Sequence, residues 1–177
     1  MGGSNSGRWH GHIKRDTVED CRFIDVNLWV REGVLNNGID RSGTWEWLSG
    51  RTGEVTAAIH YEVHLSGEGF SWVRLQYTRS RTNEDFDYKI PIQWTFPHFG
   101  GNRLWFTCPL VRPSGPCNRR AAKLYLPPGG RYFGCRRCYH LSYESCNESH
   151  SEIALFASQY DMTPGQLKKT LRKAKGK

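Results

Sequence analysis

The sequence predicts an α+β protein. A helical N-terminal segment packs on an antiparallel β-sheet of about four strands, followed by a four-cysteine zinc ribbon and a basic C-terminal helix pair. Three observations support this prediction. Residues 16–38 place apolar side chains at helical spacing, whereas residues 54–96 contain runs of alternating apolar and polar side chains. Four cysteines between positions 108 and 138 have the order of two pairs of metal ligands.

The 177 residues are enough for one moderate domain with appendages. We expect a flexible arm over 1–15, a helix-plus-sheet domain over 16–107, a zinc ribbon over 108–143 and a basic, helix-turn-helix-like tail over 144–177. No run approaches the ~18 apolar residues of a membrane span, and the N-terminus lacks the apolar stretch of a signal peptide. We therefore expect a cytoplasmic protein with reduced thiols and no membrane partner.

The first helix is predicted within the segment DTVEDCRFIDVNLWVREGVLNNG. Asp16 or Thr17 can cap its start, and Gly33 with the cluster at 36–38 ends it. Its expected apolar face contains Val18, Cys21, Ile24 and Leu28, with Val30 beside it. The phrase IDVNLWVREGVL resembles the second helix of MerR-type winged-helix regulators, which implies a helix that enters DNA. The alternative is an amphipathic helix packed on the sheet.

Residues 54–96 are predicted to form most of the sheet. The run GEVTAAIHYEVHL alternates strictly, and SWVRLQYTR repeats the pattern after the turn SGEG, so these two strands should form an antiparallel hairpin. FDYKIPIQWTF supplies a third strand, in which Pro91 favours an edge or bulged position. GTWEWL supplies a fourth strand. His60 and His64 fall on the outer face, where exposed side chains explain them better than metal ligands do.

The cysteines predict a structural zinc site. Two residues separate Cys135 from Cys138, a spacing that lets both thiolates face one metal ion. Cys108 and Cys117 form a weaker pair, because eight residues separate them where two to four are usual. Between the pairs, AAKLYLPPGGRYFG predicts two short strands around a Pro-Pro-Gly-Gly turn. We expect Zn²⁺ bound by all four cysteines; the alternatives are buried thiols or a disulfide.

The formal charge of +8 is unevenly distributed. No Asp or Glu occurs between Tyr88 and Tyr143, although nine Lys and Arg residues do. Such segregation favours a polyanionic partner, which we expect to be nucleic acid, DNA rather than RNA. The alternative is that some arginines only compensate the negative charge of a zinc–thiolate centre. The predicted nucleic-acid contacts are Arg112, Arg119, Arg120, Lys123, Arg131, Arg136, Arg137, Lys168, Lys169, Arg172 and Lys173.

The C-terminal segment SEIALFASQYDMTPGQLKKTLRKAKGK predicts two helices. Ile153, Phe156, Ala157 and Tyr160 form one apolar stripe. Thr163 should cap the second helix, with the side chain three residues later completing a capping box. The pair is similar to a helix-turn-helix, whose second helix would enter a major groove. A solvated tail or a partner-docking helix pair are the alternatives.

Several phrases resemble a widespread group of bacterial and phage-associated small zinc-ribbon proteins. They are GGSNSGRW, TVEDCR, WVREGVL, PHFGGNRLWFTCP and CNRRAAKLYLPPGGRYFGCRRCYHLSYESC. The resemblance covers most of the chain and implies a bacterial host or a mobile element. Because the group has no settled activity, it supports the fold and the setting but no function.

Together these features favour a non-catalytic zinc-ribbon protein that binds nucleic acid through its phosphate backbone. The alternative is an adaptor or inhibitor that docks on a host protein through the rigid ribbon or an aromatic face. An enzyme is the weakest hypothesis, and we expect no catalytic residues. Four thiolate ligands close the coordination shell of zinc, and the basic stretch lacks the carboxylates that would hold Mg²⁺.

Overall fold

The computed structural model describes residues 16–36, 39–66, 70–98, 100–145, 155–160, 162–163, 166–167 and 170. The chain divides into two compact units. Val18–Leu141 form the larger unit, and Met1–Thr17 with Ser142–Lys177 form the other. The larger unit contains the sheet and all four cysteines of the predicted metal site.

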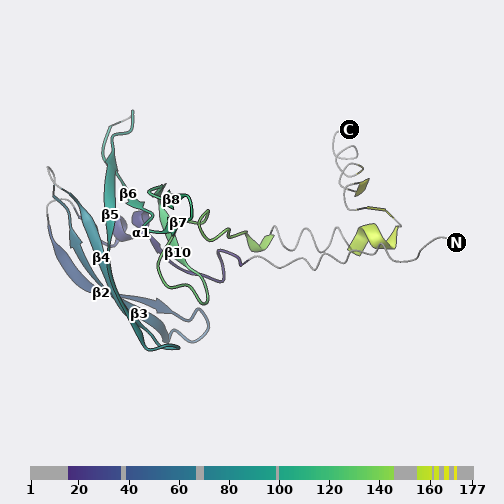
Figure 1. Cartoon of the computed structure of the whole chain (residues 1–177), viewed down its shortest axis with the longest axis horizontal. Helices are drawn as coiled ribbons and strands as arrows, with labels where there is room; N and C mark the ends of the chain where they lie inside the picture. Colours follow the sequence, from purple (N-terminus) through teal and green to yellow (C-terminus); the bar gives the residue numbers. More distant parts are fainter. Residues whose placement is uncertain are drawn as a thin grey trace. The chain divides into compact units, whose positions relative to one another are not determined.

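A curled, half-barrel sheet dominates the larger unit (Figure 1). Within the described residues it has six antiparallel strands in the order β2-β3-β4-β5-β6-β9, so that β2 to β6 follow one another as a meander. The strands are β2 (Arg41–Leu48), β3 (Val55–His64), β4 (Trp72–Arg79), β5 (Glu84–Thr95), β6 (Arg103–Thr107) and β9 (Arg120–Ala121).

The alternating runs form strands as predicted, and β3 and β4 pair antiparallel. The predicted edge position of Pro91 is wrong, because β5 pairs with β4 on one side and with β6 on the other. The N–H of Ile92 donates to Ser71 O at 2.8 Å, toward β4, so the nitrogen of Pro91 faces the β6 side. Pairing with β6 begins only at Ile92, and the missing N–H of Pro91 therefore removes no bond from that ladder.

Two smaller β elements accompany the sheet. The strand β1 (Arg22–Asp25) pairs antiparallel with β10 (Lys123–Leu126), which brings together segments about a hundred residues apart. Ile24 faces Leu124 in this pair, and both side chains are buried. The strands β7 (Val111–Arg112) and β8 (Gly115–Pro116) form a minimal hairpin.

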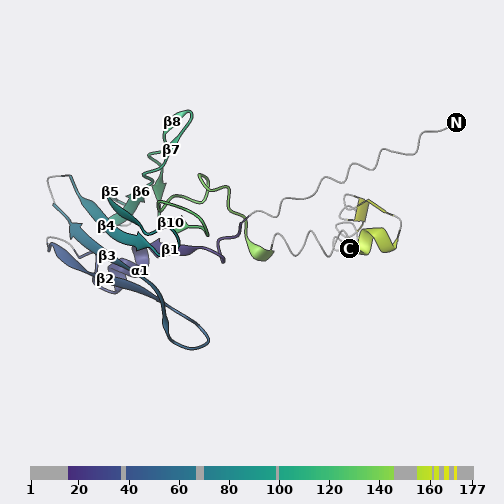
Figure 2. The same cartoon turned by 60° about the horizontal axis from the view of Figure 1, so that its bottom comes forward.

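The helix α1 (Val26–Arg31) packs against the curled sheet (Figures 1 and 2). Asp25 caps its start by accepting a hydrogen bond from Asn27 N at 2.9 Å. Trp29 is fully buried, and its ring lies 5.4–5.7 Å from the rings of Trp45, Tyr61 and Phe106. This one side chain therefore joins α1 to β2, β3 and β6.

The predicted α+β class is wrong, because the protein is mainly β. The sheet has six strands within the described residues rather than about four, and the helices described are short: α1 and residues 155–159. The long first helix capped at Asp16 or Thr17 is replaced by the extended β1 followed by α1. Pairing with β10 and burial of Ile24 stabilise the extended form of Arg22–Asp25, so tertiary contacts override the helical spacing.

In the smaller unit, Thr17 and Ser142 form an isolated bridge. Residues 155–159 are helical, and Ala157 is buried whereas Phe156 and Tyr160 are exposed. The predicted capping box is confirmed. Gln166 N donates to the Thr163 hydroxyl at 3.3 Å, and Thr163 N donates to the Gln166 side chain at 2.8 Å. Within the described ranges, no helix has the length and apolar character needed to cross a bilayer.

Candidate metal centre

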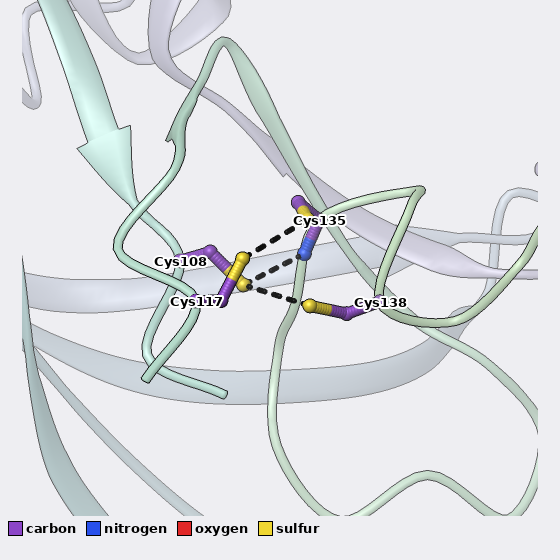
Figure 3. Close-up of side chains that lie close together, drawn as sticks. All are labelled: Cys108, Cys117, Cys135 and Cys138. Carbon is purple, nitrogen blue, oxygen red and sulfur yellow. Dashed lines mark hydrogen bonds between the residues drawn. The ribbon is translucent and has the colours of Figure 1, made fainter. Parts of the chain in front are cut away.

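The four predicted cysteines converge on one point (Figure 3). The sulfur atoms of Cys108, Cys117, Cys135 and Cys138 all lie within 4.8 Å of one another. Cys108 Sγ is 3.8 Å from Cys138 Sγ, and Cys117 Sγ is 3.8 Å from Cys135 Sγ. Cys108 and Cys135 are buried, whereas the other two are half-buried.

These separations are those of a metal site rather than of a disulfide. A sulfur–sulfur bond is about 2.05 Å long, and all four thiols are free. Tetrahedral zinc holds sulfur at about 2.3 Å, which places neighbouring sulfurs about 3.8 Å apart. The cluster can therefore hold a metal ion such as zinc with all four thiolates as ligands.

A hairpin explains the wide spacing of the first cysteine pair. Cys108 follows β6 directly, and Cys117 follows β8. Between them β7 and β8 pair with each other, and Cys117 N donates to Leu110 O at 2.9 Å. The hairpin reverses the chain direction, so the two thiols lie close together although eight residues separate them in sequence. Cys108 N also donates to Arg119 O at 2.9 Å, which fixes the segment that follows Cys117.

The second pair lies on a tight turn. Cys138 N donates to Cys135 O at 2.9 Å, and Cys135 N donates to Cys108 Sγ at 3.2 Å. Gly134 precedes this turn and pairs with Tyr125 through two backbone hydrogen bonds. A Cβ at Gly134 would lie 2.2 Å from Leu110 Cδ1, so the two knuckles approach closely only because this residue has no side chain.

Removing the proton from one thiol of the cluster is far easier than removing it from a second. Hydrogen bonding with the Cys108 sulfur lowers the pKa of Cys135 to about 4, and the same interaction, with burial, raises the pKa of Cys108. Burial also raises the pKa of Cys138. Adjacent thiolates repel one another in a partly desolvated site, and a divalent cation relieves that repulsion.

Arg112 contributes a positive charge to the cluster. Its Nε donates to Cys138 Sγ at 3.1 Å, and this bond raises the pKa of the guanidinium. Among the described residues, its Nη2 is buried without a hydrogen-bond partner. We predicted Arg112 as a phosphate contact, and no sequence feature indicated its bond to the cysteine sulfur. Its Nε thus faces the cysteine cluster, the position that the charge-compensating alternative would require.

The other predicted nucleic-acid contacts differ in whether an acidic side chain pairs with them. Lys123 pairs with Asp25 at 3.2 Å, and Arg131 pairs with Glu84 at 2.7 Å. Arg136 is exposed on the turn of the second cysteine pair. Three further arginines are exposed beside the cysteines and form no ion pair within the described residues. We call Arg119, Arg120 and Arg137 the knuckle arginines. Lys168, Lys169, Arg172 and Lys173 lie outside the residues whose side chains are described.

Outside the cysteine cluster, no group of three or more His, Cys, Asp or Glu side chains within the described part of the chain could hold a metal ion. His64 instead lies 2.7 Å from Asp40 and stacks on Trp72, and His60 is exposed.

No protein-family model, curated protein or solved structure matches the chain. The four-cysteine cluster is thus the part of the predicted zinc-ribbon resemblance that has structural support, and no family is identified.

Proposed function

We propose that the cysteine cluster binds one structural zinc ion and that the protein binds nucleic acid through the basic surface beside it. The observation that carries this proposal is the position of the knuckle arginines. They are exposed, lack acidic partners among the described residues and lie next to both cysteine pairs.

The sulfur geometry supports zinc. Sulfur–sulfur separations of 3.8 Å agree with tetrahedral coordination, and thiolates are soft ligands that select zinc over Mg²⁺ or Ca²⁺. Four protein ligands leave no coordination position for water or substrate, so the ion would act in folding rather than in catalysis. Apparent binding energies of about 10–16 kcal/mol in small zinc domains indicate how strongly such an ion stabilises a fold.

The charge distribution supports a polyanionic partner. The 56 residues from Tyr88 to Tyr143 contain no carboxylate side chain. Arg112 donates a hydrogen bond to Cys138 Sγ, and ion pairs with Asp25 and Glu84 partly neutralise Lys123 and Arg131. The knuckle arginines retain their charges. Guanidinium groups suit bidentate contacts with phosphate oxygens, and such contacts give affinity without sequence specificity.

The zinc proposal is tested by metal analysis. Freshly purified protein should contain one zinc per chain, and Cys117→Ser should lower both the zinc content and the melting temperature, because one ligand is lost. Cys21→Ala is the matched control, since this buried cysteine lies outside the cluster, and it should retain one zinc. A folded, metal-free protein whose melting temperature is unaffected by a chelator would contradict the proposal.

The nucleic-acid proposal is tested by the salt dependence of binding. Each knuckle arginine changed to Ala should reduce the slope of log K against log [salt] by about 1, because each lost phosphate contact releases fewer counterions. Arg41→Ala removes an exposed charge at the start of β2 and should leave the slope unchanged. A flat salt response of the native protein excludes this function. A stoichiometric protein partner that survives nuclease treatment would favour the adaptor instead.

A further inference from the structure

A pocket of about 320 Å³ lies on the larger unit, and none of the four clustered cysteines lines it. Its walls come from β1, the end of β2, the start of β3, the end of β4 and the glycine turn that follows β10. This volume lies within the range of about 300–1,000 Å³ typical of small-molecule sites, and mouths of β-barrels are common places for them.

The pocket is positively charged. Arg22, Arg79 and Arg81 line it, and no Asp or Glu does. Arg22 Nη2 donates to Thr56 O at 3.3 Å, and Arg79 Nη2 donates to Gly129 O at 3.1 Å. Each guanidinium has five N–H donors, so these bonds orient two arginines and occupy one donor of each.

Little negative charge offsets these arginines. Glu84 lies 3.8 Å from Arg79, but the same carboxylate binds Arg131 at 2.7 Å. Arg81 is exposed and forms no ion pair within the residues that the structure describes. Guanidinium groups that line a pocket without acidic walls favour a phosphate or a similar oxyanion.

Aromatic side chains form part of the remaining wall, beside small and hydroxyl-bearing residues. It includes the half-buried rings of Trp47 and Tyr77, and Phe133 stacks on Trp47 at a centroid distance of 6.1 Å. Trp47 Nε1 donates to Phe23 O, and the Tyr77 hydroxyl donates to Arg131 O, so both rings are held in place. Fixed aromatic side chains are suited to contact a planar ring.

We propose that this pocket binds a nucleotide, with its phosphate at the three arginines and its base against Trp47 and Tyr77. The ligand can be a free mononucleotide or the phosphorylated end of a strand, because the two share this chemistry. The pocket shares no residue with the knuckle arginines, so this proposal and nucleic-acid binding beside the cysteines stand or fail separately.

The test uses the full-length, zinc-loaded protein and a fluorescent adenine mononucleotide. Saturable binding is expected, with competition by unlabelled AMP and not by adenosine. Arg81→Glu and Arg22→Ala should each weaken binding by roughly tenfold or more, because each removes hydrogen bonds to a charged group. The matched control, Arg41→Glu, changes an exposed arginine that does not line the pocket and should weaken binding less than about twofold.

Competition by a 5′-phosphorylated tetranucleotide and by its unphosphorylated form identifies the source of the ligand. If the mononucleotide binds and neither tetranucleotide competes, the pocket holds a free nucleotide. If only the phosphorylated strand competes strongly, the pocket holds a strand end. The proposal is overturned if the native protein shows no saturable binding. It is also overturned if adenosine competes as well as AMP, or if both pocket variants bind like the native protein while near-ultraviolet circular dichroism shows them folded.

Discussion

Arg112 lies where the hairpin β7–β8 meets the second cysteine pair. Its bond to Cys138 Sγ adds one positive charge to a centre that would carry a formal charge of −2 as a zinc tetrathiolate. This bond and the burial of its Nη2 hold the side chain in place. Contacts of this kind orient a metal ligand and control how readily the ion leaves.

Arg112→Gln should therefore release zinc faster and lower its affinity by roughly 10–100-fold, the usual effect of losing a group that supports a metal ligand. The zinc affinity and release rate of Arg112→Lys should lie between those of the native protein and of Arg112→Gln, because lysine keeps the charge but lacks the planar guanidinium. The measurement is zinc transfer to a coloured chelator over time. Arg120→Gln, at an exposed arginine without a bond to sulfur, should match the native rate. Equal rates for all four proteins would refute this role.

At this scale the sequence predicts the cysteine ligands but not their neighbours. The two-residue spacing of Cys135 and Cys138 is a local signal that survives without any tertiary information. The bond from Arg112 to Cys138 joins residues 26 positions apart and depends on how two knuckles meet. Because this stretch contains many basic residues, its sequence does not indicate which arginine faces a cysteine sulfur.

At the scale of elements, α1 illustrates how a short helix depends on packing. Six residues are too few for a stable isolated helix, so burial of its apolar face must supply the stability. Trp29 provides most of that face, with Trp45, Tyr61 and Phe106 around it. Val30, the next residue, is exposed.

Trp29→Ala should reduce the free energy of unfolding by about 3–5 kcal/mol, because it leaves a large cavity between α1 and the sheet. Val30→Ala is the control on the same helix and should change it by less than about 0.5 kcal/mol. Denaturant titrations followed by circular dichroism measure both values. A loss below about 1 kcal/mol for Trp29→Ala would mean that α1 contributes little to the core.

Residues 18–25, which precede α1, show why the long first helix was predicted wrongly. Val18, Cys21 and Ile24 have helical spacing, yet Arg22–Asp25 is extended because it pairs with β10. That partner lies about a hundred residues away, where local periodicity carries no information. The β3–β4 hairpin was predictable because its alternation and its turn are both local. The strands β7, β8 and β9 have two residues each, too few to produce any alternating pattern.

At the scale of the whole molecule, the hydroxyls of Tyr77 and Tyr88 connect the sheet to the segment that precedes Cys135. The Tyr77 and Tyr88 hydroxyls lie 3.3 Å apart, and the Tyr88 hydroxyl accepts a hydrogen bond from Phe133 N at 2.9 Å. Burial raises the pKa of Tyr77 and of Tyr139 to about 12, and it raises the pKa of Tyr88 further.

Alkaline pH should therefore destabilise the protein. Unfolded tyrosine ionises near pH 10, so above that pH the unfolded chain loses protons that the folded chain retains. Stability from these groups is complete below about pH 10 and declines as the pH rises through about 12. Melting temperatures between pH 8 and 12 measure the decline, and Tyr77→Phe should make it less steep. A melting temperature that stays constant up to pH 12 would contradict this expectation.

The fold class could not be predicted because it depends on pairing between distant parts of the chain. Composition and alternation indicate strands, but they do not reveal that β6 and β9 extend the meander into a curled sheet. Nor do they reveal that Phe133, two residues before Cys135, packs on Trp47 and Tyr77 of the sheet. The cysteine cluster and the sheet thus share one core.

The strand β9 gives this arrangement a further consequence. It covers the outer edge of β6 with only two residues, and it begins three residues after Cys117. If the ion leaves and this segment detaches, β6 presents unpaired backbone N–H and C=O groups to solvent, and a strand from another molecule can add there. Metal loss should then appear first as self-association of a still-folded sheet, so the ion would protect against aggregation as well as stabilise the fold.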